Sequence, residues 1–189
     1  MVEGAARPRV LLDACVLYPS VLREVVLGVA QRGLIVPLWS ARILAEWGHA
    51  ASRRGDDAAP AIAHAARAFP HAEVTVEAGL ERTLDLPDRA DAHVLAAAIS
   101  GEAQLLVTLN LRDFPQRTMA AHALRAEDPD TLLMRLWLQH PDAVEAAVAD
   151  VVARAEDIAG APRPLRRLLK RAGLPRLGKA LESCDLSRP

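Results

Sequence analysis

Four acidic residues of this sequence occupy positions at which a fold presents side chains for chemistry. Asp13 closes an apolar run at residues 10–12, and Asp113 lies in the polar loop that follows a second apolar run. Asp91 falls in the first turn of the helix predicted before that second run, and Glu46 lies on a helix predicted after the first crossover. Ligands of an open parallel sheet bind beyond the carboxyl ends of its strands. The four acids are therefore candidates for one shared crevice.

Such a crevice would hold several carboxylates with no lysine between them. Carboxylates held close together repel one another, and their pKa values rise unless a cation neutralises them. Oxygen ligands without cysteine, and without histidines at a fixed spacing, favour Mg²⁺ or Mn²⁺ over zinc. A divalent cation polarises a phosphate ester, lowers the pKa of a bound water and stabilises the leaving oxygen. We therefore expect a metal site suited to phosphodiester cleavage.

Two polar residues near the second apolar run are candidates for supporting roles. Thr108 could orient a carboxylate or a water through its hydroxyl, and Asn110 stands in the same loop as Asp113. Helix capping is a competing interpretation of Asp91, since Asp88 precedes it by three residues in the pattern of a capping box. We assign Asp88 to the cap and Asp91 to the site. The allocation of the site role between Asn110 and Asp113 stays open.

The histidines and cysteines show no metal-ligand spacing. His93 has no second histidine four residues on, and we interpret it as a surface or packed residue. Cys15 and Cys184 lie nearly the whole chain apart, and the sequence contains no CxxC pair. This pattern excludes zinc fingers and disulfide scaffolds.

The elements that must position these residues alternate between strand and helix. Continuous apolar runs such as 10–12 and 105–107 are typical of strands buried on both faces of a parallel sheet. An N-cap at Ser40 and stop signals at Gly33 and Gly101 help to delimit the helices. The expected strands cover residues 10–12, 34–38, 73–77, 105–107 and 121–126, and the expected helices cover residues 20–33, 40–53, 58–69 and 88–101. This alternation predicts an α/β fold of three layers, in which helices flank a central parallel sheet.

A helical extension is predicted to follow this α/β part. Helices are expected over residues 128–137 and 141–158, and residues 160–164 form a linker-like break before a basic segment of short helices. We divide the chain into a catalytic domain at residues 1–126 and a helical extension with a basic tail at residues 127–189.

The charge of the chain is divided unevenly. Residues 161–189 contain eight basic and two acidic residues, whereas residues 1–160 contain 15 basic and 22 acidic residues. A basic segment supplies the charge that a polyanion needs, and the acidic part alone would repel it. An amphipathic helix with a solvated cationic face is the competing interpretation, and its apolar positions could also receive a partner helix. The candidate RNA-binding residues are Arg163, Arg166, Arg167, Lys170 and Arg171.

Composition excludes several classes of protein. The chain has 189 residues, of which 51% are hydrophobic, 25% are charged and 3% are aromatic, with a net charge of −1. These values do not fit a disordered or collagen-like chain. No apolar run reaches the roughly 18 residues of a membrane helix, and the first ten residues lack the pattern of a secretory signal. We therefore expect a cytoplasmic protein without membrane contact.

Four segments together resemble the successive motifs of the PIN domain family. They read VLLDACVLYP, LAEW, LPDRADAHVLAAA and LVTLNLRDFP, at residues 10–19, 44–47, 86–98 and 106–115. Each motif is weak alone, but the four stand in the family's order within residues 9–125. The chain is similar in particular to the branch that contains VapC-type toxins of toxin–antitoxin pairs.

The resemblance implies a fold, an activity and partners. It implies a PIN-like α/β catalytic domain that acts as a metal-dependent endoribonuclease, with Asp13, Glu46 and Asp91 as metal-binding acids and Asp113 as the fourth. It also implies an RNA substrate, an antitoxin protein that blocks the site, and a second copy of the chain as a possible partner. A metal-activated water would attack the phosphodiester in line, and the products would carry a 5′ phosphate.

Two other functions remain as alternatives. A phosphoaspartyl enzyme would use Asp13 as its nucleophile, but that chemistry commonly needs a second acid two residues later, where this chain has Cys15. A non-catalytic RNA- or protein-binding module would keep the same scaffold. The second alternative gains weight if the four acids do not converge in space.

Overall fold

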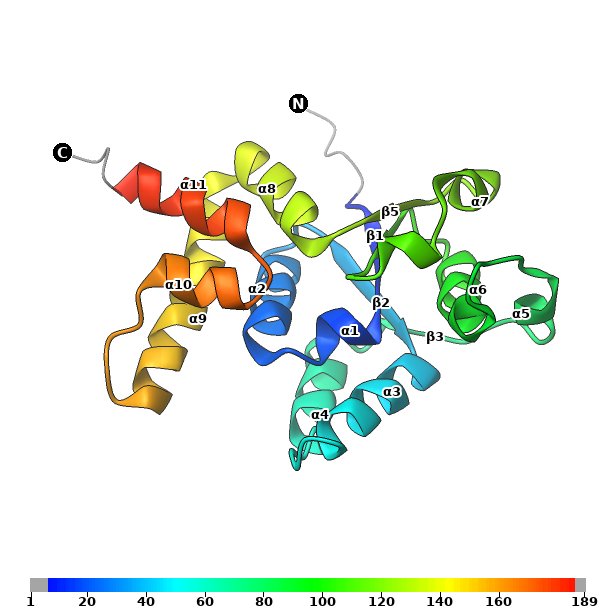
Figure 1. Ribbon diagram of the computed structural model, residues 1–189, viewed down its shortest axis with the longest axis horizontal. Helices are drawn as coiled ribbons and strands as arrows, with labels where there is room; N and C mark the ends of the chain where they lie inside the picture. Colours follow the sequence, from blue (N-terminus) through cyan, green and yellow to red (C-terminus); the bar gives the residue numbers. More distant parts are fainter. Residues whose placement is uncertain (1–6, 186–189) are drawn as a thin grey trace.

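The computed structural model describes residues 7–185 and contains a five-stranded parallel sheet. The strand order is β3-β2-β1-β4-β5, so β1 lies at the centre (Figure 1). The strands are β1 (Arg9–Leu12), β2 (Val36–Ser40), β3 (Glu73–Val74), β4 (Leu105–Val107) and β5 (Arg125–Glu127). The chain leaves β1 and β4 at the same edge of the sheet, where the candidate acids were expected.

Strands β1 and β4 are apolar because helices cover both faces of the sheet at its centre. Leu11 of β1 pairs with Leu38 on one side and Leu106 on the other, and all three side chains are fully buried. Helix α6 (Ala92–Ser100) packs on one face of the sheet, and α2 (Ser20–Gln31) lies on the other (Figure 1). The predicted three-layer α/β fold is confirmed.

Most predicted helices occur within two residues of the expected bounds. They are α2, α3 (Ala41–Ser52), α4 (Ala59–Ala68) and, later in the chain, α8 (Pro129–Gln139) and α9 (Pro141–Ala159). The short elements were not predicted, because a single turn has too few positions to show a period. They are α1 (Ala14–Leu17), α5 (Leu80–Thr83), α7 (Gln116–Ala121) and the 3₁₀ turn η2 (Leu111–Asp113). The helix expected over residues 88–101 consists of a 3₁₀ turn, η1 (Arg89–Asp91), followed by α6.

Two edge strands differ from the prediction. Residues 73–77 alternate between polar and apolar side chains, but only Glu73–Val74 pair, with β2. The last strand begins at Arg125; of the expected residues 121–124, the first ends α7 and the other three form the turn after it. Edge strands have one neighbour instead of two, so their sequence pattern constrains their ends weakly.

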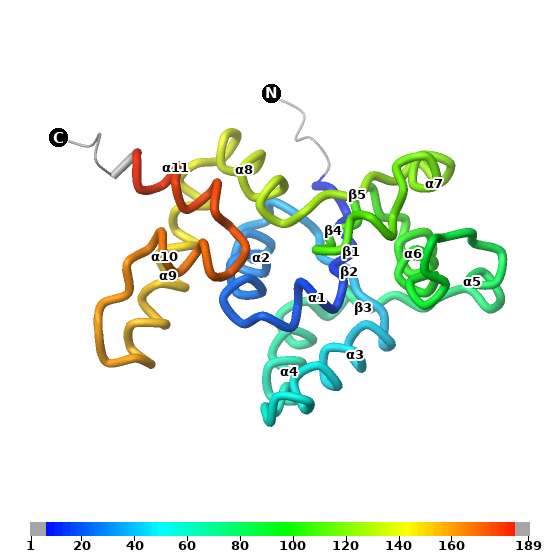
Figure 2. Tube along the Cα trace, in the orientation of Figure 1, coloured from blue at the N-terminus to red at the C-terminus, as the bar shows by residue number. Residues whose placement is uncertain are grey.

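The helical extension packs on the α/β part instead of trailing from it. Helices α8 and α9 are followed by α10 (Leu165–Arg171) and α11 (Pro175–Asp185), and the four lie together beside α2 (Figure 2). Their buried side chains, among them Leu133, Val148 and Leu169, join the same apolar core as the sheet. None of the helices within residues 7–185 combines the length and apolar character needed to cross a bilayer.

Asp130 fastens the extension through its buried carboxylate. One oxygen accepts from the backbone N–H of Arg176 at 2.9 Å and from its Nε at 3.2 Å, and the other accepts from the backbone N–H of Leu177 at 3.0 Å. These backbone groups open α11 and have no partner inside their own helix. One side chain of α8 therefore caps α11 and holds α10 and α11 in place.

We predict that Asp130→Ala destabilises the protein by about 3 kcal/mol, since it leaves two helical N–H groups and a guanidinium without their buried acceptor. Urea unfolding measures the free energy. Asp142→Ala, in the exposed first turn of α9, is the control and should change stability by less than about 1 kcal/mol. Equal losses in the two variants would contradict the capping role.

Candidate active site

Asp13 joins β1 to α1 and is held by two side-chain donors. It stands at the N-cap position of α1, yet its carboxylate makes no capping hydrogen bond. Instead, Oδ2 accepts from the hydroxyl of Thr108 at 2.6 Å and from the thiol of Cys15 at 3.1 Å. Within the described part of the chain, Oδ1 has no hydrogen-bond partner. The carboxylate is thus anchored by one oxygen and offers the other.

The loop after β4 directs these two donors toward Asp13. The backbone N–H of Leu109 donates to Cys15 Sγ at 3.2 Å, and that of Asn110 donates to Thr108 Oγ1 at 3.0 Å. A thiol or hydroxyl that accepts from a backbone N–H keeps its own proton for another acceptor. The loop therefore sets the direction of both protons, and the hydroxyl of Thr108 points to Asp13.

Glu46 reaches the same region from α3. Ile43 and Trp47 of this helix are fully buried, which fixes the face that Glu46 presents. Its Oε1 lies 2.9 Å from Nε2 of His93 and 3.5 Å from Nε of Arg42. A nitrogen and an oxygen at 2.9 Å need a proton between them. Both contacts fall on one oxygen, as they do in Asp13.

His93 belongs to the buried face of α6. Its side chain is 3% exposed, and its Nδ1 is buried with no hydrogen-bond partner among the described residues. Burial, together with the charge of Arg42, lowers the pKa of His93 to about 4, against the opposing charge of Asp13. The ring is therefore neutral near pH 7, and we assign its proton to Nε2, which faces Glu46.

Asp91 lies at the junction of η1 and α6. The backbone N–H of Ala90 donates to Asp88 Oδ1 at 2.8 Å, so Asp88 makes the predicted cap. Asp91 makes no side-chain capping bond. Burial raises the pKa of Asp91 to about 6, with further contributions from the negative charges of Asp13, Asp88 and Asp113. The negative charges of the neighbouring acids therefore contribute to the raised pKa of Asp91. The capping hydrogen bond that the competing interpretation requires is not observed.

Asp113 and Asn110 interact with each other. The amide of Asn110 donates to Asp113 Oδ2, and Arg112 Nε donates to Asn110 Oδ1 at 3.2 Å. Asn110 lines the cleft described next, whereas Asp113 is not among the residues that line it. The negative charge of Asp113 contributes to the raised pKa of Asp91. On this geometry Asn110 stands closer to the cleft, and Asp113 stands behind it.

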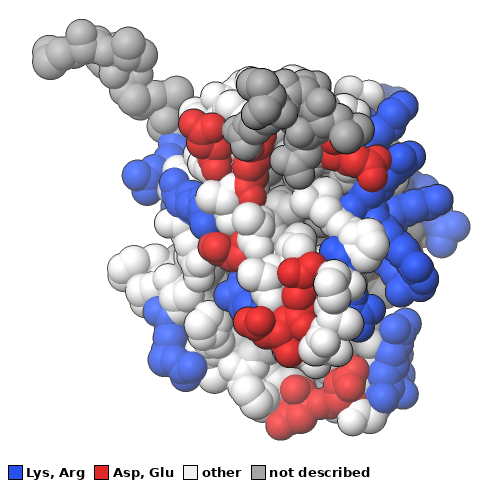
Figure 3. Space-filling model, turned by 90° about the vertical axis from the view of Figure 1, so that its left-hand side faces the viewer, with Lys and Arg blue, Asp and Glu red and all other residues white. Residues whose placement is uncertain are grey.

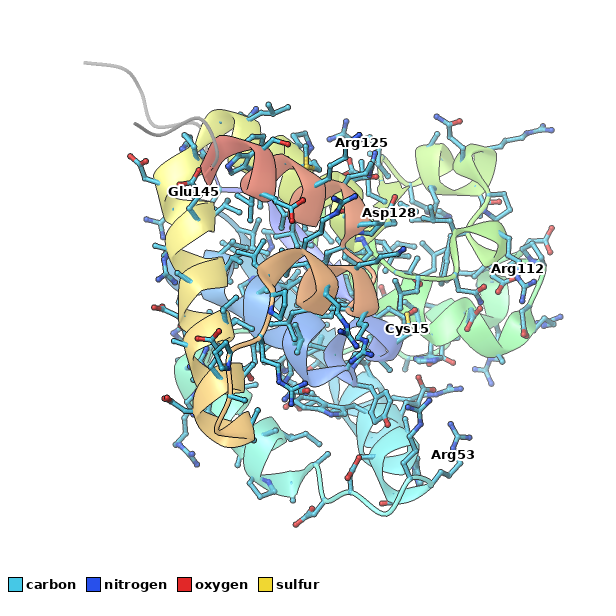
Figure 4. The ribbon with its side chains drawn as sticks, turned by 60° about the vertical axis from the view of Figure 1, so that its left-hand side comes forward. Cys15, Arg53, Arg112, Arg125, Asp128 and Glu145 are labelled. Atoms are coloured by element: carbon cyan, nitrogen blue, oxygen red, sulfur yellow. The ribbon has the colours of Figure 1, made fainter. Side chains whose placement is uncertain are left out.

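One wide cleft, with a volume of about 1590 Å³, brings the acids from three separate segments together. Asp13, Glu46, Asp91 and Asn110 all line it. Figure 4 shows Cys15 on this side of the molecule, between α10 and the green helices on the right of the view. Arg53 lies at the lower end of α3. Burial raises the pKa of Glu46, and the charges of Asp13 and Asp91 raise it further, while Arg42 opposes the rise. The cleft therefore holds mutually repelling carboxylates.

The chemical types of these side chains suit a hard divalent cation, but their positions do not surround one point. The side chains are carboxylates, two of which, Asp13 and Glu46, have one oxygen held by the protein, and their repulsion is what a cation would relieve. Within residues 7–185, however, no three histidine, cysteine or acidic side chains already surround one point closely enough to hold an ion. Binding would have to draw the carboxylates together.

The predicted RNA-binding residues do not share one environment. Arg171 lines the cleft, and Arg163, Arg167 and Arg171 line a smaller pocket beside it. Arg166 Nη1 is paired with Glu182 Oε2 at 2.8 Å, and Lys170 lines neither hollow. In Figure 3, Lys and Arg are densest along the right-hand edge and recur on the left, while Asp and Glu lie in the middle and toward the top and bottom of the face.

Sequence reasoning missed Cys15 and His93 as neighbours of the acids. His93 was interpreted as a surface or packed residue, and it is packed, but against Glu46. A signal was present, because residues 92–98 are otherwise apolar and a polar side chain buried in such a run needs a partner. For Cys15 the signal was only its place in the turn directly after Asp13.

We predict that Cys15 is unreactive toward iodoacetamide in the folded protein. Burial raises the pKa of its thiol to about 12, with a smaller contribution from the charge of Asp13, and the thiolate is the reactive form. In a Cys184→Ser variant at pH 8, alkylation followed by mass spectrometry should be at least about 100-fold slower than in the same variant unfolded in urea. Equal rates would contradict the protonated, buried thiol.

Comparison with a family model covers the segments that carry Asp13, Glu46 and Asp91. A family model described as PIN domain matches residues 9–112. A curated protein of Mycobacterium tuberculosis (strain ATCC 25618 / H37Rv), named "Putative ribonuclease VapC50", is 34% identical over 62 residues. These residues are 33% of this chain and 37% of that relative, so the alignment spans little more than a third of the relative's length. No solved structure matches the chain.

Proposed function

Since this chain belongs to the PIN domain family, we propose that it is a divalent-metal-dependent endoribonuclease that acts as the toxin of a toxin–antitoxin pair. The observation that carries the proposal is the meeting of Asp13, Glu46 and Asp91, from three distant segments, in one cleft where burial, and then the charges of neighbouring acids, raise the pKa values of Glu46 and Asp91. A structural role does not require like charges to be gathered there. The similarity to VapC50 supports the choice of RNA as substrate.

Mg²⁺ or Mn²⁺ is the cofactor that we propose for the cleft. Asp13, Glu46 and Asp91 would hold it, with Asp113 as the fourth acid and Asn110 and Thr108 in support. When bound, such a cation stabilises the negative charge that develops on the phosphate and makes a nearby water more acidic. Hydrolysis in which the 3′ oxygen leaves would give products with a 5′ phosphate.

The protein's own contribution is to hold the carboxylates before the substrate arrives. Thr108 and Cys15 fix Asp13 through Oδ2, and His93 fixes Glu46 through Oε1. The remaining oxygens are then free to bind without a further loss of side-chain freedom, which is how partners of a ligating group raise affinity and precision. Arg42 is shared between Glu46 and Glu81, so it neutralises Glu46 only in part.

We propose residues 1–126 as the catalytic part and residues 127–189 as a docked extension. The partners that we propose are an RNA substrate, an antitoxin protein that occupies the acidic cleft, and a second copy of this chain. A non-catalytic binding module remains the second candidate, and the observation in its favour is that no three ligands within residues 7–185 are already in place around one point. Cleavage and metal-binding measurements distinguish the two.

A cleavage assay tests the activity directly. With Mg²⁺ or Mn²⁺, the wild-type protein should cut a mixed RNA pool, and EDTA should stop it. Asp13→Asn and Asp91→Asn should lower the rate by at least about 100-fold, since each removes a charge that the cation needs, whereas Asp142→Asn should not. If the wild type and both cleft variants cleave equally, the nuclease assignment is wrong.

Metal affinity tests the role of His93. We predict that His93→Leu weakens Mn²⁺ binding about 10- to 100-fold by calorimetry, because Glu46 loses its anchor. His93→Gln, which keeps an N–H donor, should recover part of the loss, and His64→Leu, at an exposed position of α4, should have no effect. Urea unfolding checks that each variant is folded. Wild-type affinity in folded His93→Leu would exclude a positioning role.

A further inference from the structure

A small pocket of about 260 Å³ beside the acidic cleft is lined by three arginines. Arg163, Arg167 and Arg171 stand four residues apart, and the remaining lining residues are small or apolar. Residues four apart lie on the same side of a helix, so Arg167 and Arg171 share one face of α10. Arg163 continues this row in the segment just before the helix. The pocket thus concentrates positive charge on one side.

The guanidinium groups of these arginines have no anionic partner within residues 7–185, although the backbone N–H of Arg163 donates to Glu156 Oε1 at 2.8 Å. None of the three guanidinium groups makes a hydrogen bond or an ion pair there, although Arg32, Arg135 and Arg166 elsewhere each contact a carboxylate within 3.0 Å. Like charges four residues apart destabilise a helix slightly. Neighbouring basic positions behave differently, since Arg166 is paired with Glu182. The row therefore presents unneutralised charge on one face of the helix.

The arginine pocket is continuous with the cleft that holds the acids. Leu168 and Arg171 line both hollows. The position of α10 is fixed as well, because Leu169 is fully buried and Asp130 caps the next helix, α11. A ligand that touches the arginines can therefore extend toward Asp13, Glu46 and Asp91 without any movement of the fold.

We propose that Arg163, Arg167 and Arg171 form a subsite for backbone phosphates of the RNA strand whose cleaved bond lies at the acids. This inference rests on the proposed function and names how the substrate is held. Arginine suits the role because its planar group donates two parallel hydrogen bonds to a phosphate. Such contacts position a strand without reading its sequence. They also add to the attraction of Arg53 and Arg54, which line the cleft together with the carboxylates that repel a polyanion.

The test measures RNA binding without cleavage. Each variant is made in the Asp13→Asn background and titrated, in EDTA, against a fluorescein-labelled single-stranded RNA, with anisotropy read at several NaCl concentrations. The pair R167A/R171A is compared with R166A/K170A, which removes two basic side chains from a row about 100° round the same helix. R117A/R125A removes two exposed arginines that line neither hollow. Urea unfolding confirms that every variant is folded.

R167A/R171A should bind RNA at least about tenfold more weakly, and the slope of log K against log salt should fall by about 1.4, which is 0.7 for each lost phosphate contact on a single strand. R166A/K170A should lose less than about threefold, and R117A/R125A should match the parent. Equal losses for the two α10 pairs, or no RNA binding by the parent, would overturn the subsite.

A poly-glutamate peptide serves as the competing ligand. If it binds the parent and RNA does not, the partner is an acidic protein and the proposal is wrong. The nuclease proposal fails separately, because it is judged by cleavage with metal in the protein that retains Asp13. Loss of RNA binding in R167A/R171A would support the subsite even if no cleavage were found.

Discussion

The mutual repulsion of carboxylates at one edge of the sheet is the constraint on which the rest of this structure depends. Asp91 and Glu46 both have raised pKa values, for which burial and neighbouring acids are responsible. The surrounding residues do not remove this repulsion with a central cation of their own. They hold one oxygen of Asp13 and one of Glu46 from behind, through hydrogen bonds and a buried imidazole. The free energy stored in the cleft is therefore available to whatever cation binds there.

The part of this arrangement that could be predicted from sequence is the part encoded locally. A pattern of a few residues predicts the strand that ends in Asp13. A similarly short pattern predicts the helix that begins near Asp88 and Asp91. The parallel sheet then brings the ends of β1 and β4 together without further information. By contrast, the contacts of His93 with Glu46 and of Thr108 with Asp13 join residues 47 and 95 positions apart. No local sequence pattern specifies which side chains will be in contact across that separation, or in which rotamers.

The extension illustrates a second limit. Net charge indicated a basic tail, but charge alone does not separate one side of a short helix from the other. In the folded chain, Arg166 pairs with Glu182, while Arg167 and Arg171 turn toward the small pocket. The decisive contact is Asp130, which reads in sequence as an ordinary first-turn acid of α8 and in the structure caps α11. The division of roles among the basic residues follows from that docking.

On the proposed function, separation of the two charges would allow one cleft to bind both a cation and a polyanion. An arginine placed among Asp13, Glu46 and Asp91 would neutralise them and compete with the metal, as Arg42 already does in part for Glu46. Of the arginines on α10, Arg171 lines the cleft and Arg167 lines the smaller pocket, and neither makes an ion pair with Asp13, Glu46 or Asp91. Phosphates held there would lie along the strand from the scissile bond. The helical extension would then supply the attraction and the sheet edge the chemistry, and Asp130 would fix their relative position.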